Sequence, residues 1–231
     1  MVNIQKDFET KFTGWAFIVA AALLWVGWAL APHHIGEYIV ASDFEAIGDK
    51  VWTFIWMYRI HIFGWVAMGV ALFALVSIMA KKPWRVLVLP GAGVLIIGTF
   101  TLAIAAAYYY NYGAWGVGQT AGKSATEIQE FMDDILYTNQ YVTCFIRFGR
   151  VFSGVGLVLL GAGFVKWSTL PKWLGWFTAL LGLTAVVVIM GIPDNFEIYK
   201  PLFHIKVLWL IAMGAVILKQ GIQLPKSNEQ A

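Results

Sequence analysis

Six apolar stretches, each about as long as the 20 residues with which an α-helix crosses a bilayer, constrain what this chain can fold into. Only 13% of the 231 residues are charged and 60% are hydrophobic, whereas a soluble domain has about 25% charged residues. The sequence therefore predicts an all-α integral membrane protein with one membrane domain over residues 1–231. The predicted spans are 14–31, 58–80, 86–108, 143–165, 173–192 and 202–218, and the loops 32–57, 109–142 and 193–201 join them on one side.

The Lys and Arg residues outside these spans are distributed unequally between the two sides. Nine lie on the side of the chain termini, whereas the other side has three, together with ten of the 13 acidic residues. Because basic residues collect on the cytoplasmic side of membrane proteins, both termini are predicted to be cytoplasmic. We therefore expect a multi-pass protein of the cell inner (plasma) membrane, with its longer loops facing the periplasm or the exterior. The net charge of +3 gives no indication of nucleic-acid binding, and the expected partners are the lipid bilayer and, as an open alternative, other membrane subunits.

A short amphipathic helix is predicted within the loop 109–142. Ser124 and Glu127 have the spacing of a capping box, which marks a helix start. Apolar residues then follow at helical spacing, at Ile128, Phe131, Met132, Ile135 and Leu136. Such a helix is expected at the outer membrane interface. Because its polar face is acidic, we expect it to cover the outer mouth of the bundle rather than bind anionic lipid.

Ionisable residues lie near the start of three predicted spans. Such groups are costly in hydrocarbon and usually face the bundle interior or a watery cavity, so they predict a polar pocket in the outer half of the membrane. The alternative is that the long Arg and Lys side chains merely extend to the interface. The candidate residues are Arg59, His61, Arg147, Arg150, His204 and Lys206, and His33, His34 and Asp194 lie where neighbouring spans end on the same side.

Helical geometry limits which of these residues can face the pocket. Arg147 and Arg150 are three residues apart and share a helix face, so they are expected to form one cationic cradle. Arg59 and His61 are two apart and point in nearly opposite directions. Since an imidazole cannot extend far towards water, His61 is expected to face inward and Arg59 outward.

The same spacing separates His204 from Lys206. By the same argument His204 is expected to face inward. Lys206 is then expected to share a pocket with Asp194 or another acid, and these two residues, with His33 and His34, are possible acid–base groups.

The favoured function is that of a small redox-associated membrane subunit that handles haem b or a quinone. Two histidines on different helices can ligate haem iron while arginines neutralise the propionates. His61 and His204 are the expected iron ligands, and His33 or His34 is an alternative to either. A quinone pocket would use the same groups.

Two other functions remain open. Arg147 and Arg150 could anchor a small anionic or polar molecule in a transporter or binding protein, with His61 as a proton-sensitive group. Small residues at helical spacing allow close helix packing and would also suit a non-catalytic scaffold or assembly subunit. The chain has no phosphate-binding glycine loop, no His-Glu-x-x-His motif and no nucleophile motif, so whether it is an enzyme stays open.

Overall fold

The computed structural model describes residues 2–30, 43–79, 85–166, 170–192 and 196–220. Within these ranges the regular structure is helical, without a strand, and six helices are long and apolar enough to cross a membrane. The prediction of a six-span helical protein is therefore confirmed at the level of length and composition. The long helices are α1 (Val2–Ala29), α3 (Val51–Met79), α4 (Arg85–Tyr110), α7 (Leu136–Lys166), α8 (Lys172–Gly191) and α9 (Phe196–Gln220).

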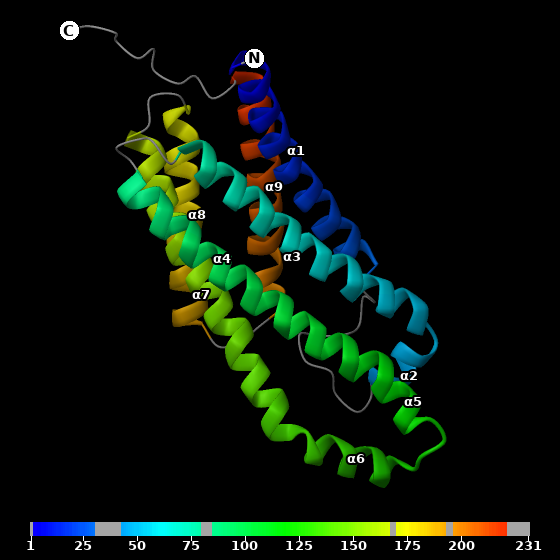
Figure 1. The fold of residues 1–231 in the computed structure, drawn as a ribbon. Coiled ribbons are helices and arrows are strands. Elements are labelled where there is room, and N and C mark those ends of the chain that lie inside the picture. The colour runs from blue at the N-terminus through cyan, green and yellow to red at the C-terminus, as the bar shows by residue number, and fades with distance from the viewer. Residues whose placement is uncertain (1, 31–42, 80–84, 167–169, 193–195, 221–231) are drawn as a thin grey trace, which may run out of the picture.

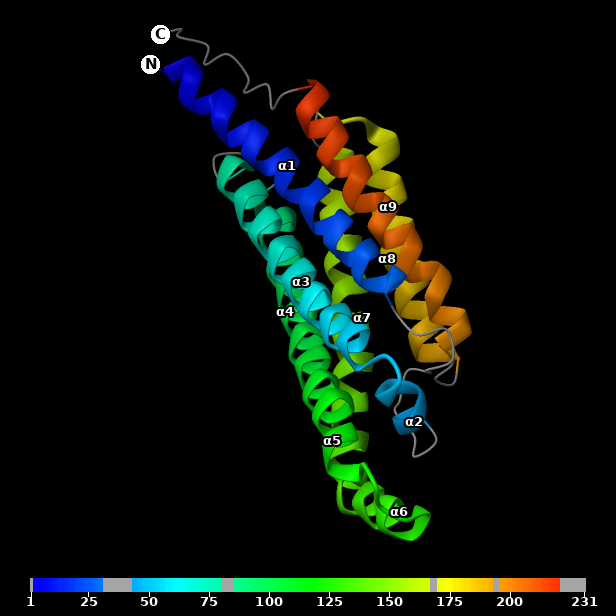
Figure 2. The same ribbon diagram turned by 90° about the vertical axis from the view of Figure 1, so that its right-hand side faces the viewer.

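These long helices pack side by side in a ring. In chain order α1 packs on α3, α3 on α4, α4 on α7 and α7 on α8, and α9 lies between α8 and α1. The first residues of α1 and the last of α9 lie at one end of the bundle, whereas α2 (Asp43–Gly48) and α6 (Ala125–Asp134) lie at the other (Figure 1 and Figure 2). We call these the terminal end and the α6 end.

Four long helices begin well before the apolar pattern predicts. α1 begins at Val2 rather than Gly14, and α9 begins at Phe196 rather than Leu202. α3 begins at Val51 rather than Tyr58, and α7 begins at Leu136 rather than Thr143. Hydropathy reports only the part of a helix that fits hydrocarbon, whereas polar and aromatic residues can continue the same helix beyond it. Arg59 and His61 consequently lie well inside α3, with helical residues on both sides.

The connection between α4 and α7 consists of short helices rather than an extended loop. A π-helical turn, Asn111–Trp115, follows α4 and leads into α5 (Gly116–Thr120) and then α6. The capping box forms: the Glu127 N–H donates to Ser124 Oγ at 3.4 Å, and the Ser124 N–H donates to the Glu127 carboxylate at 2.7 Å. Whether α6 lies at a membrane interface stays a prediction.

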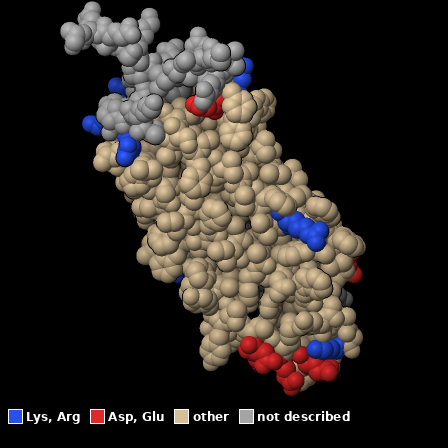
Figure 3. Space-filling view, in the orientation of Figure 1, with Lys and Arg blue, Asp and Glu red and all other residues tan. Residues whose placement is uncertain are grey.

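The predicted apolar stripe of α6 is shorter than its sequence spacing suggests. α6 ends at Asp134, Ile135 is its C-cap residue, and Leu136 begins α7. Ile128, Phe131 and Met132 pack against a cluster of buried side chains from the α6 end of the bundle. The exposed acidic residues of α6 gather at this end (Figure 3), and they are Glu127, Glu130, Asp133 and Asp134.

Glycines bring the backbones of α4 and α7 into contact. A Cβ atom on Gly98 would lie 2.5 Å from the Gly149 oxygen, and one on Gly156 would lie 2.7 Å from the Gly91 oxygen. Real Cβ atoms do not approach this closely, so a side chain at either position would force the helices apart. Gly64, Gly154 and Gly161 also meet atoms of neighbouring helices. The small-residue spacing thus has an explanation within one chain and does not require a partner subunit.

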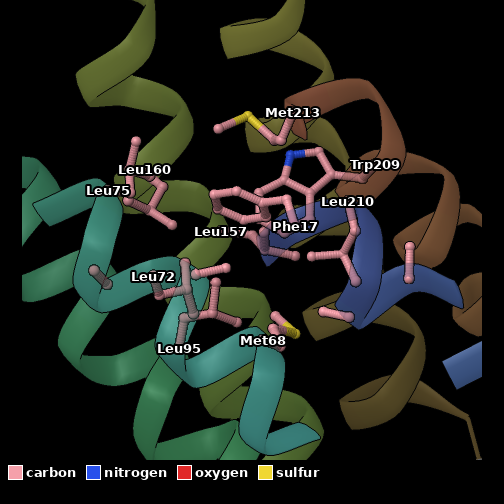
Figure 4. Close-up of a cluster of buried hydrophobic side chains, with 14 of the residues drawn as sticks. Phe17, Met68, Leu72, Leu75, Leu95, Leu157, Leu160, Trp209, Leu210 and Met213 are labelled. Carbon is pink, nitrogen blue, oxygen red and sulfur yellow. The ribbon is translucent and has the colours of Figure 1, made fainter. Parts of the chain in front are cut away.

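Apolar side chains fill the half of the bundle near the terminal end. Figure 4 shows Phe17 of α1, Leu72 of α3 and Trp209 of α9 converging there. Trp209 is completely buried, and its Nε1–H donates to Thr178 Oγ of α8 at 2.8 Å. A buried indole N–H normally needs such a partner. This core packs the helices together near the terminal end, and a second buried cluster lies at the α6 end.

Candidate functional site

A cavity of about 250 Å³ lies between the long helices. Each of these helices contributes to its wall, through residues that lie towards the α6 end. From α1 to α9 in chain order, examples are Trp28, Phe54, Tyr109, Ile146, Ile189 and Tyr199. The cavity therefore occupies the centre of the α6 half, and its volume suits a small ligand, because drug-sized ligand sites are about 300–1,000 Å³.

The described part of the wall has three cations and no Asp or Glu. Each cation lies over an aromatic ring, a contact that stabilises positive charge by about 0.5–2 kcal/mol without neutralising it. The pairs are Arg150 over Tyr199 at 4.5 Å, Lys200 over Trp28 at 5.8 Å and Lys206 over Trp65 at 4.9 Å, measured to the ring centroid. The charge of the described wall therefore favours an anion.

His61 reaches the cavity from α3. Its ring packs so closely on α1 that a Cβ atom on Gly27 would lie 3.0 Å from it, and its centroid is 6.0 Å from that of Phe203 on α9. Arg59 lies on another side of α3, where it donates to the Tyr110 hydroxyl at 2.9 Å. Its guanidinium also lies 5.4 Å from the ring centroid of Trp56. The imidazole thus faces the cavity and the guanidinium does not.

In α9 the cation, rather than the imidazole, lies on the cavity wall. The Trp25 Nε1–H donates to His204 Nδ1 at 3.3 Å, and the Trp28 ring packs edge-on against His204 at 5.1 Å. α9 packs along α1, which turns the His204 face towards these tryptophans. His204 therefore does not face the cavity as the sequence analysis expected, and Lys206 occupies that inward position instead.

The two arginines of α7 contact different neighbours. Arg147 Nη2 donates to the backbone oxygen of Ile189 on α8 at 3.2 Å, whereas Arg150 lies over Tyr199 of α9 and lines the cavity. Three residues correspond to less than a full turn, so a shared helix face still allows two different neighbouring helices. Of the two arginines that were expected to form one cradle, only Arg150 lines the described cavity wall.

Three predicted site residues, His33, His34 and Asp194, lie outside the described residues, and their roles stay predictions. Within the described ranges, no group of three or more His, Cys, Asp and Glu side chains could hold a metal ion. Cys144 is exposed on α7.

Several polar wall residues were not singled out as site residues from the sequence: Ser153, Lys200 and the tyrosines Tyr58, Tyr109 and Tyr199. Ser153 follows Arg150 by three residues and so lies on the same face of α7. This spacing could have identified it as a wall residue. The sequence analysis placed Lys200 in the loop 193–201, but α9 begins at Phe196 and places Lys200 inside a helix. A hydropathy pattern does not show this extension.

No family model matches the chain, and neither a curated protein nor a solved structure is significantly similar to it. The kind of ligand that the protein could bind is therefore inferred from the residues that line the cavity. Cations, hydroxyl groups and aromatic faces line the described wall, an arrangement suited to binding an amphipathic molecule with hydrogen-bond acceptors.

Proposed function

We propose that this multi-pass membrane protein is a binding or transport protein for a small amphipathic anion, which it holds in the central cavity. The observation that carries the proposal is Lys206, an ammonium group inside a membrane-spanning helix, on the cavity wall and over the Trp65 ring. Intramembrane charges are costly and usually mark a ligand pathway or a paired site. A bound anion would supply the counter-charge.

The remainder of the wall supports an amphipathic ligand rather than an inorganic ion. Rings of Phe54, Trp65 and Phe203 line the cavity together with aliphatic side chains. Aromatic faces bind planar apolar groups favourably. An apolar body against these rings, with an acidic group near Lys206, would satisfy both parts of the wall.

The predicted orientation places the α6 end, and with it the cavity, on the outer side of the membrane. The unequal distribution of basic residues supports this placement. A reporter that fluoresces only when it folds in the cytoplasm, fused to the C-terminus, tests it. Fluorescence is expected, and its absence with a normally expressed fusion protein would reverse the orientation.

Binding of 2-naphthoate, a planar carboxylate, tests the proposed function. Protein in phosphatidylcholine nanodiscs is dialysed to equilibrium against 2-naphthoate, with empty nanodiscs as the background. We expect saturable binding that exceeds the binding of 2-naphthylmethylammonium, which has the opposite charge. Equal binding of the two probes, or none above background, would overturn the proposal.

Lys206→Gln should weaken binding of 2-naphthoate by about tenfold or more, because a hydrogen bond to a charged group contributes roughly 1.5–3 kcal/mol. Lys219→Gln is the matched control, since Lys219 is an exposed lysine in the last turn of the same helix. It should bind as the wild type does. An equal loss in both variants would mean that overall charge, and not the cavity, attracts the probe.

A quinone is the second candidate, and the combination of wall donors with the rings of Trp65 and Phe203 favours it. Quinone oxygens accept hydrogen bonds, and the ring is neutral and planar. Menadione in the same dialysis experiment distinguishes the two ligands. Tighter binding of menadione than of 2-naphthoate, with little effect of Lys206→Gln, would favour the quinone.

Haem b ligated by His61 and His204 has less support. His61 is on the described cavity wall, whereas His204 accepts a hydrogen bond from Trp25 and is not part of that wall. An absorption spectrum of the purified protein tests this alternative. A Soret band that both His61→Ala and His204→Ala abolish would establish haem ligation and replace the anion proposal.

A further inference from the structure

Ser153 differs from the four buried threonines in the described part of the chain, because its hydroxyl, like those of Tyr108 and Tyr112, has no hydrogen-bond partner there. The four buried threonines, which are Thr13, Thr99, Thr120 and Thr178, donate to the backbone oxygen four residues earlier at 2.6 to 2.8 Å. This is a common way for a helix to satisfy a hydroxyl group. Ser153 Oγ has no hydrogen-bond partner in the described structure, although the residue is only 4% exposed.

The crossing of α4 and α7 explains where this hydroxyl points. A Cβ atom on Gly98 would lie 2.7 Å from Ser153 Oγ and 2.5 Å from the Gly149 oxygen. The backbone oxygen four residues before Ser153 is therefore packed against α4. Ser153 also lines the cavity, and its hydroxyl is packed at the tight helix crossing beside that cavity.

A buried hydroxyl without a partner is unfavourable, and the cavity is the place from which a partner can come. Arg150 lies three residues earlier on the same face of α7, and Lys206 lines the cavity from α9. Ser153, Arg150 and Lys206 thus line the same cavity, and they bring one hydroxyl group and two cations to it. Such a set matches a group that has negative charge and also accepts directional hydrogen bonds.

We infer that Ser153 donates a hydrogen bond to the anionic group of the ligand, which makes that group an oxyanion such as a carboxylate, and this inference rests on the proposed function. Ser153 then acts as a specificity-determining residue. The cations attract negative charge of any kind, whereas the hydroxyl selects an oxygen acceptor at one depth of the cavity.

Two naphthalene probes separate the hydrogen bond from the charge. Methyl 2-naphthoate has the same ring and a carbonyl acceptor as 2-naphthoate, but it is neutral. Ser153→Ala should weaken the binding of both probes in nanodiscs, by about tenfold for 2-naphthoate, because a donor to the oxygen is lost. Lys206→Gln should weaken only the binding of the charged probe.

The thermal stability of the ligand-free protein is the second measurement. Ser153→Ala should leave the unfolding temperature unchanged or raise it, because the variant removes a buried polar group that has no partner. Thr178→Val is the control: the Thr178 hydroxyl donates to the Leu174 oxygen and accepts from Trp209. This variant should lower the unfolding temperature and leave binding of 2-naphthoate unchanged, since Thr178 is not on the described cavity wall.

The outcomes distinguish the inference from the proposed function. If 2-naphthoate binds in a Lys206-dependent manner but Ser153→Ala binds it like the wild type, the inference is wrong and the anion site stands. The same holds if Ser153→Ala lowers the unfolding temperature without changing affinity, because Ser153 would then have a structural role or bind only water. If the wild type binds neither probe, the proposed function is wrong and the inference fails with it.

Discussion

The halves of α3 and α9 that border the cavity each contain a cation and an imidazole two residues apart, but they orient these two groups in opposite ways. In α3 the imidazole of His61 reaches the cavity while Arg59 binds Tyr110 elsewhere. In α9 the ammonium of Lys206 reaches the cavity while His204 binds Trp25.

The difference follows from the neighbours of each helix. α3 packs between α1 and α4, whereas α9 lies between α8 and α1. Two tryptophans of α1, Trp25 and Trp28, provide a polar N–H and an aromatic face for His204. A spacing of two residues separates the faces of a helix, but the packing of the helix selects which face points inward.

The largest effect is expected from exchanging the two residues of α9. The double variant His204→Lys, Lys206→His keeps the composition but moves the cation to the α1 face. Binding of 2-naphthoate should weaken by roughly a hundredfold, near the upper end for a charged hydrogen bond. Equilibrium dialysis in nanodiscs measures the loss. Retained affinity in a folded double variant would show that the position of the cation is unimportant.

Glycine-to-alanine substitutions test how tightly α1 packs against α9 and against α3. A Cβ atom on Gly214 of α9 would lie 2.6 Å from the Gly14 backbone oxygen, so Gly214→Ala should destabilise the protein by about 1–3 kcal/mol. A Cβ atom on Gly27 would meet the His61 ring at 3.0 Å, and Gly27→Ala should destabilise less because an imidazole can shift. Unfolding in mixed detergent micelles measures both.

Gly93→Ala is the control for these substitutions, because a Cβ atom there meets nothing within 4 Å. It should be neutral or slightly stabilising, since Ala favours a helix over Gly. A larger loss from Gly27→Ala than from Gly214→Ala would mean that the contact with His61 is the more rigid one.

A smaller effect is expected at Arg59. Arg59→Gln removes the hydrogen bond to Tyr110 and the contact with the Trp56 ring, at a cost of about 0.5–1 kcal/mol for a partly exposed cation–π contact. Binding of 2-naphthoate should be unchanged, whereas Arg150→Gln should weaken it. Unfolding and dialysis of both variants check this contrast. Weaker binding in Arg59→Gln would place Arg59 among the residues that affect the cavity.

The smallest effect should come from α6, which lies outside both regions. The Ser124 backbone N–H and hydroxyl donate to the Glu127 carboxylate and lower the pKa of Glu127 below its ordinary value. The carboxylate therefore stabilises α6 above the ordinary Glu pKa, and this contribution is lost as the pH falls through the lowered one. Amide exchange in 125–134, corrected for its intrinsic pH dependence, should rise at acidic pH. Glu127→Gln should abolish this dependence, and its persistence would contradict the assignment.

Local features of the sequence account for much of the fold. The apolar stretches predicted six spans because each helix must satisfy its own backbone in hydrocarbon, and the structure contains six helices of that kind in its described residues. The capping box at Ser124 and Glu127 was also predictable, since both partners lie within one turn. The starts of α1, α3, α7 and α9 were not predictable, because hydropathy identifies only the part of a helix that lies in hydrocarbon, and these helices continue beyond it.

Part of the candidate site could be read from the same local rules. Ionisable residues within spans indicated Arg150, His61 and Lys206, which all line the cavity. Ser153 was hidden because its significance depends on a backbone contact between α4 and α7, far apart in the chain. A serine in an apolar run has the same sequence signature whether or not its hydroxyl has a partner.

The sequence by itself determined which segments are helices able to span a membrane and which residues share a helix face, because hydropathy and the helical repeat are local properties. Only the tertiary structure decided that His61 and Lys206 point inward while Arg59 and His204 point elsewhere. The rotation of a helix about its axis is set by contacts with neighbours distant in the chain, such as the α1 tryptophans around His204.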